Sequence, residues 1–180
     1  MDKALRFIDR LSGVIAAIAM ILVVGLVFVM INEVFSRYVL HRPRIYSLDL
    51  TFMLNGSLFM LATAYTLRAG GLIRIDFFSS QMPLRLQHAV NFVFFLLCML
   101  PILGVLSYTG IMRSWAAYET GRREMASSWG PVVWPYYSAL TLGCVMLWLQ
   151  CIVETVRFAI GIGSPDKVPA PGAGDKTIEA

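Results

Sequence analysis

The side chains that could do chemistry in this sequence gather between long apolar runs. Near the middle of the chain, Arg68, Arg74 and Asp76 surround the adjacent glycines Gly70 and Gly71. Charges and glycines between two apolar runs are typical of a polar hinge at a membrane surface. We expect these residues to fix the hinge or contact lipid headgroups, and a purely local structural role is the alternative.

A second set of charges lies in the other two turns of the chain. Glu33 and Arg37 are four residues apart, in the order that favours an ion pair on a helix. Exposed charges at such a rim steer the association of a soluble partner, whereas ordinary interfacial anchoring is the alternative. The candidate docking residues are Arg37, Arg42, Arg44, Asp49, Glu119, Arg122 and Arg123.

The sequence predicts neither catalysis nor a cofactor. Cys98, Cys144 and Cys151 lack the close pairing of metal or redox sites, so we interpret them as packing residues. Haem ligation would require His41 and His88, but His41 lies in a turn and His88 is expected at a helix start, at headgroup level. We therefore predict no enzyme, no metal site and no catalytic residue.

The composition indicates a membrane protein. Of 180 residues, 58% are apolar and 14% are charged, and the mean hydropathy is +0.70; soluble domains are usually 45 to 50% apolar. The 15 Lys and Arg residues are spread along the chain without a basic patch, which excludes nucleic acid as a partner.

The apolar runs predict an all-α integral membrane protein with four transmembrane helices and short interfacial helices. A run of about 20 apolar residues crosses a bilayer, and the first one is too long for a signal peptide. A short interfacial helix is expected to begin at Asp76. The predicted membrane domain is 1–160, with spans at about 11–35, 50–67, 86–112 and 132–153 and a disordered tail at 161–180.

Several local features are expected within this plan. Ser47 should cap the second span, with Asp49 in its first turn, and Pro101 should kink the third span. Residues 113–124 should form a loop, in which Gly121 stops a helix. One stripe of the second span is small or polar and should face protein, either in this chain or in another subunit. Its residues are Thr51, Asn55, Ala62 and Thr66.

The distribution of Lys and Arg predicts the orientation. Four spans place both termini on one side of the membrane. That side, with the hinge, carries nine Lys and Arg residues, against six in the two other turns. Positive residues favour the cytoplasm, so both termini are expected there.

Three motifs together resemble a known family over roughly residues 10–155. They are the exit of the first span (Arg37, Tyr38, Val39, Pro43), the central block (Arg68, Gly70, Gly71, Ile73, Arg74, Ile75, Asp76, Pro83) and the entry to the last span (Ser127, Ser128, Trp129, Pro131, Trp134, Pro135, with Leu149 and Gln150). The combination resembles the small membrane subunit, of DctQ type, of tripartite ATP-independent periplasmic (TRAP) transporters.

The resemblance implies a function and partners. A periplasmic binding protein (DctP type) would deliver an organic acid, and a large permease subunit (DctM type) would carry it with sodium across the bacterial inner membrane. This chain would be the non-catalytic scaffold of that symporter, in contact with membrane lipids. An independent membrane anchor or assembly subunit of another complex is the alternative.

Overall fold

The protein is described here by a computed structural model covering residues 2–69, 83–125 and 128–163. Within these ranges the chain is helical, and the only strand-like pairing is an isolated bridge between Arg123 and Val132. Four helical stretches are long and apolar enough to cross a membrane, which confirms the predicted all-α, four-span fold. They are Leu11–Tyr38, Ile45–Leu67, Leu84–Glu119 and Trp134–Gly163. The short helix expected from Asp76 lies outside the described residues.

A tight turn connects the first two helices. Helix α1 (Asp2–Tyr38) runs without interruption from the N-terminal segment through the first apolar run, and α2 (Ile45–Arg68) follows. The predicted cap of α2 is wrong: the N-cap residue is Arg44, which makes no side-chain cap, and the first turn contains no acidic residue. Ser47 instead lies inside the first turn of α2, where its backbone N–H donates to the carbonyl of Arg44 at 3.3 Å.

The third span consists of three consecutive helical segments. These are α4 (Leu84–Phe94), the single π-helical turn η1 (Phe95–Met99) and α5 (Leu100–Glu119). Pro101 is the second residue after the π-turn, and a wider turn accommodates a proline ring that would otherwise clash with a carbonyl of the preceding turn. The prediction of a loop at 113–124 is wrong for most of these residues, because α5 continues to Glu119.

Gly121 stops α5 as the sequence predicts. It adopts a φ of +58°, and the N–H groups of Gly121 and Arg122 donate to the carbonyls of Tyr118 and Ala117 at 3.3 and 3.2 Å. This pair of bonds is the Schellman arrangement, in which a glycine takes the left-handed position.

The last span, α6, differs from its predicted bounds at both ends, since it covers Trp134–Gly163. It starts after Val132 because Val133 donates to the carbonyl of Arg122 at 3.1 Å and so belongs to the preceding turn. Helix α6 also continues past Glu154 into the segment predicted as tail, where Gly161 packs against His88. Residues 164–180 lie outside the described part.

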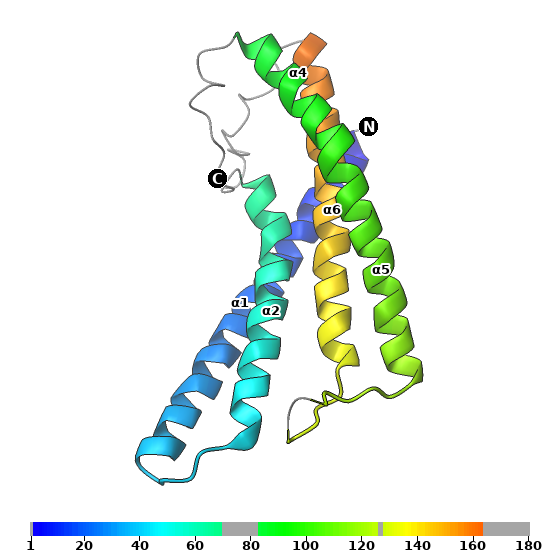
Figure 1. Cartoon of the computed structure of the whole chain (residues 1–180). Coiled ribbons are helices and arrows are strands. Elements are labelled where there is room, and N and C mark those ends of the chain that lie inside the picture. Colours follow the sequence, from blue (N-terminus) through cyan, green and yellow to red (C-terminus); the bar gives the residue numbers. More distant parts are fainter. Residues whose placement is uncertain (1, 70–82, 126–127, 164–180) are drawn as a thin grey trace.

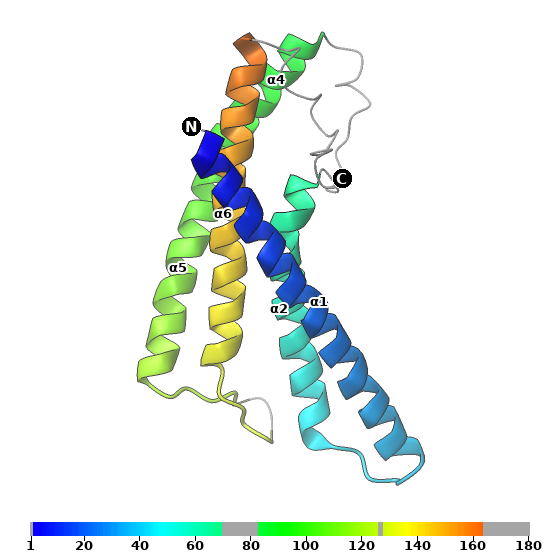
Figure 2. The same ribbon diagram turned by 180° about the vertical axis from the view of Figure 1, so that it is seen from behind.

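Helix α6 is the centre of the bundle. It contacts α2, α4 and α5 extensively, whereas α1 packs mainly along α2. Figures 1 and 2 show that the α1–α2 pair and the α5–α6 pair diverge toward the end that carries the turns at 39–44 and 120–133. We call this the turn end of the molecule.

Glycines and one indole bring the helices close to α6. A Cβ on Gly143 would lie 2.7 Å from the backbone of Met60, so α2 and α6 touch here through their main chains. On the other side, the Trp148 indole N–H donates to the carbonyl of Leu100 at 3.0 Å, beside Gly104. Small residues allow such close approach, and packing is the main force between helices in lipid.

Candidate functional site

Hydrogen bonds to the Glu33 carboxylate stabilise the first of the two turns at the turn end, which connects α1 to α2. Its carboxylate accepts two hydrogen bonds from the Arg37 guanidinium, at 2.8 and 3.2 Å, and one from the Arg44 backbone N–H at 3.4 Å. The Glu33–Arg37 ion pair is the one that their spacing predicts. The hydroxyl of Ser36 donates to the carbonyl of Arg42 at 2.7 Å. Together these bonds fix the direction in which α2 leaves α1.

Aromatic contacts connect the first turn to the second. The Arg44 guanidinium bonds to the Tyr46 hydroxyl and lies over its ring, 5.7 Å from the centroid. The Tyr46 ring is in turn 5.9 Å from the ring of Trp129. The two turns, more than 80 residues apart in sequence, therefore meet at the turn end.

Backbone hydrogen bonds within the second turn, which connects α5 to α6, stabilise it. Beyond Gly121, the N–H of Glu124 donates to the carbonyl of Pro131 at 2.9 Å, and Arg123 bridges to Val132. Gly130, just before the second segment, has a φ of +59°, a conformation that favours glycine. Arg122 and Arg123 therefore belong to a hydrogen-bonded stretch of backbone.

The structure brings the candidate docking residues to one end of the molecule, but not as one patch. Arg37 is paired with Glu33, and the Glu119 carboxylate accepts a hydrogen bond from the Trp115 indole N–H at 2.8 Å. Asp49 is half-buried in α2, whereas Arg42, Arg122 and Arg123 are exposed. Docking of a soluble protein here remains a prediction.

Some residues of the predicted stripe on α2 face other helices of this chain, and others face its surroundings. Ala62 packs against the buried cluster that contains Ile15, Ala19 and Met146, so it faces protein of the same chain. Thr51 and Thr66 are half-buried, whereas Asn55 is exposed.

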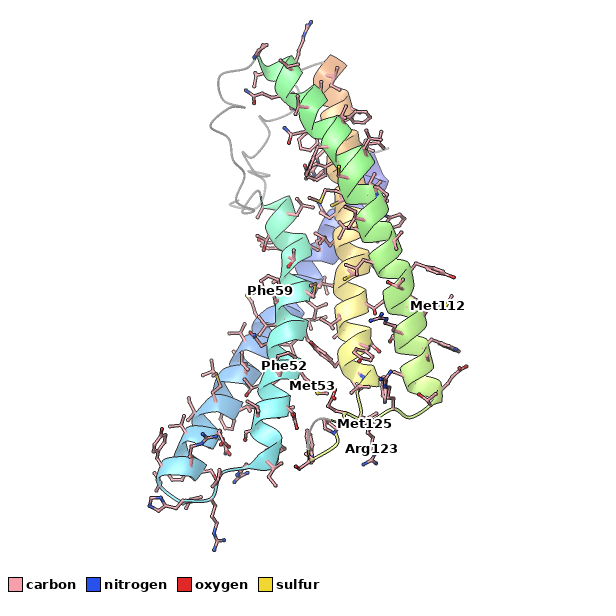
Figure 3. All side chains as sticks on the ribbon, viewed as in Figure 1. Phe52, Met53, Phe59, Met112, Arg123 and Met125 are labelled. Carbon is pink, nitrogen blue, oxygen red and sulfur yellow. The ribbon has the colours of Figure 1, made fainter. Side chains whose placement is uncertain are left out.

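The exposed amide of Asn55 lies among aromatic side chains. Phe52 and Phe59, which are 72% and 65% exposed, lie along the same side of the helix (Figure 3). The side chain of Asn55 forms no hydrogen bond with any described residue.

Most of the candidate hinge lies outside the described residues. This applies to Gly70, Gly71, Arg74 and Asp76. Arg68 is the last residue of α2. A role in lipid contact or in fixing the hinge remains a prediction.

A buried polar pair and a buried histidine could not be recognised from the sequence. Ser12 and Gln150 are both fully buried, and the Ser12 hydroxyl donates to the Gln150 side-chain carbonyl at 3.0 Å, which ties α1 to α6. The available signal was a polar side chain in each of the two apolar runs, among several others of the same kind.

His88 lies near the start of α4, as expected, but its side chain is buried rather than exposed; its level in the membrane remains a prediction. It is fully buried between helices, with its ring 6.1 Å from that of Phe158. A Cβ on Gly161 would lie 2.7 Å from Nδ1. Burial follows because α6 is longer than predicted and covers the start of α4.

The comparisons with known proteins give one finding about the family. The model of the family described as "Tripartite ATP-independent periplasmic transporters, DctQ component" matches residues 26–160. The match covers more than half of the chain and includes α2, the third span and most of α6. The comparison with curated proteins gives no match. No group of three or more metal-ligating side chains occurs in the described ranges.

Proposed function

We propose a specific role for this chain, which belongs to the DctQ component family of tripartite ATP-independent periplasmic transporters. It is the small permease subunit of a secondary transporter, without catalytic activity of its own. It supports a large permease subunit that takes up an organic acid together with an ion. A periplasmic binding protein delivers the substrate.

The outer side of α2 carries this proposal. An exposed Asn55 in the middle of a span would leave its amide without a partner in lipid, and polar side chains in membrane spans usually bond to another helix. Phe52 and Phe59 beside it supply large apolar area for packing. We infer that the large permease subunit covers this side of α2.

The distribution of charge supports a scaffold more than a transport pathway. The interiors of the four apolar runs contain no Asp, Glu, Lys or Arg. Transporters commonly place ionisable groups or broken helices near the middle of the membrane. The sodium and substrate sites therefore belong, in this proposal, to the large permease subunit.

The turn end faces the periplasm in this proposal, and both termini lie in the cytoplasm of a bacterial cell. The excess of Lys and Arg on the side of the termini supports this orientation. The charged first turn, with Arg37, Arg42, Arg44 and Asp49, together with Glu119, would then meet the binding protein. Arg122 and Arg123 also line a cleft with Arg113, for which a different partner is inferred below.

Reconstituted uptake tests the proposed role. Vesicles with an inward sodium gradient would receive the permease, this chain and the binding protein, together or singly, and accumulation of a labelled organic acid would be measured. We expect uptake only with all three components. Undiminished uptake without this chain would refute the scaffold role, and uptake by this chain alone would refute the absence of a pathway.

The same assay tests docking at the first turn. Arg42→Glu should lower uptake several-fold at a limiting concentration of binding protein, and the deficit should change with salt, because rim charges mainly affect association. Arg85→Glu is the matched control, since Arg85 is exposed at the opposite end of the molecule. Equal effects of the two reversals would contradict docking at Arg42.

A further inference from the structure

A basic cleft lies at the turn end, between α5, α6 and the second turn. Its volume is about 910 Å³, and its lining includes Arg113, Arg122, Arg123, Met125 and Tyr137. Arg113 belongs to α5 and Tyr137 to the first turn of α6, while Arg122 and Arg123 follow the glycine that stops α5. Figure 3 shows Arg123 and Met125 on the turn beneath the ends of these helices.

The three guanidinium groups are available to an external anion. Among the described residues, none of them forms an ion pair or a side-chain hydrogen bond. Glu119, the nearest acidic residue of α5, is bonded to Trp115 and does not line the cleft. Arginine presents a planar set of donors that matches the oxygens of a phosphate group.

An apolar groove leads from the basic cleft toward the middle of the membrane. It has a volume of about 320 Å³ and shares Arg113 and Tyr137 with the basic cleft. Its walls come from three helices: Met60 of α2, Leu106 and Thr109 of α5, and Leu140 and Cys144 of α6. Cys144 is about 10 Å deeper than Tyr137 along α6.

The lining and direction of the groove suit a hydrocarbon chain. Its walls are mainly apolar side chains of α2, α5 and α6, and it follows α6 from Tyr137 to Cys144.

We propose that the basic cleft and the apolar groove together form a binding site for one anionic phospholipid. The phosphate lies among Arg113, Arg122 and Arg123, and an acyl chain lies between α2 and α5 over α6. A positive cleft continuous with an apolar groove is complementary to a molecule with an anionic headgroup and a hydrocarbon tail. The bilayer around the protein supplies this ligand, and the site is independent of whether the chain supports a permease.

Lipid titration tests the site on the full chain. The purified protein in detergent would be titrated with phosphatidylglycerol or phosphatidylcholine, and bound lipid would be counted by native mass spectrometry. We expect phosphatidylglycerol to bind more tightly. Each of Arg113→Gln, Arg122→Gln and Arg123→Gln should weaken its binding about fivefold. Arg42→Gln, at the other turn, is the matched control and should leave the affinity unchanged.

A second variant tests the groove separately from the charges. Thr109→Trp places a large ring in the groove from the exposed side of α5 and should weaken phosphatidylglycerol binding while the arginines remain. Tyr108→Trp, on the neighbouring exposed position, should have no effect. Glycerol 3-phosphate, which has the phosphate but no chain, should not compete at equal concentration.

Three results would overturn the lipid site. One is equal weakening by Arg42→Gln and the three cleft variants, which would indicate a general charge effect. Another is unchanged binding in Thr109→Trp. The third concerns the occupant: a photoreactive residue at position 109 in the assembled complex should label lipid, and labelling of a partner protein instead would assign the groove to that protein.

Discussion

Ser12 and Gln150 join the first and last helices through one buried hydrogen bond. Both side chains are fully buried, and the Ser12 hydroxyl donates to the Gln150 side-chain carbonyl at 3.0 Å. Measured hydrogen bonds of this kind between membrane helices average about 0.6 kcal/mol and reach about 1.7 kcal/mol. This one bond therefore contributes modestly to stability but selects the rotation of α1 against α6.

A double-mutant cycle measures that contribution. Ser12→Ala, Gln150→Leu and the double variant would be unfolded reversibly in mixed micelles, and the free energies of unfolding compared. We expect a coupling energy of about 0.6 to 1.7 kcal/mol. The control is Thr155→Val, because the Thr155 hydroxyl bonds within its own helix, to the Cys151 carbonyl at 2.7 Å. A Ser12–Gln150 coupling no larger than that of Ser12 with Thr155 would contradict the structure.

His88 and Glu33 show which polar residues can be interpreted from sequence. Glu33 and Arg37 interact within one helix, so their spacing is sufficient to predict the pair. His88 is buried by Gly161, which lies in another helix far along the chain. No local pattern contains that contact, and the same holds for Ser12 with Gln150.

At the scale of elements, Gly143 determines how closely α2 and α6 pack. Gly143→Ala would place a methyl group 2.7 Å from the backbone of Met60, so the helices must move apart or shift. We expect a loss of about 1 to 3 kcal/mol in the free energy of unfolding, as for other overpacked sites. Thermal unfolding in detergent, followed by circular dichroism, measures it.

Gly25→Ala is the matched control for this substitution. A Cβ at Gly25 would have no heavy atom within 4 Å, and alanine favours a helix more than glycine does. The variant should be as stable as the wild-type protein or more stable. Equal destabilisation by both substitutions would contradict the close approach of α2 and α6.

The existence of the four helices could be predicted from sequence, but several of their ends could not. Apolar runs identify spans because lipid requires them, and Gly121 marks the end of α5 through its local conformation. The helices α5 and α6 continue beyond their apolar runs because Trp115, Glu119 and Arg157 tolerate a helix as well as a loop. At α2 the predicted cap failed because the helix begins at Ile45, which places Ser47 inside its first turn.

At the scale of the whole molecule, the arrangement of helices determines which surfaces remain for partners. Since α6 is central, α1 and α5 contact the rest of the chain on one side only, and the pairs diverge at the turn end. The sequence predicted a polar stripe on α2 but not its division: Ala62 packs inside this chain and Asn55 points out of it. That division depends on where α1 lies, which periodicity does not determine.

The binding of the large permease subunit to the outer side of α2 is the central claim, and Asn55 tests it most directly. The complex would be purified through a tag on this chain, and the amount of co-purified permease would be measured. Asn55→Leu should reduce it about three- to eighteenfold, because a partner group in the permease loses its hydrogen bond. Asn32→Leu, the same change at an exposed position of α1, should leave it unchanged. Retention of the permease by Asn55→Leu at the wild-type level would contradict the claim.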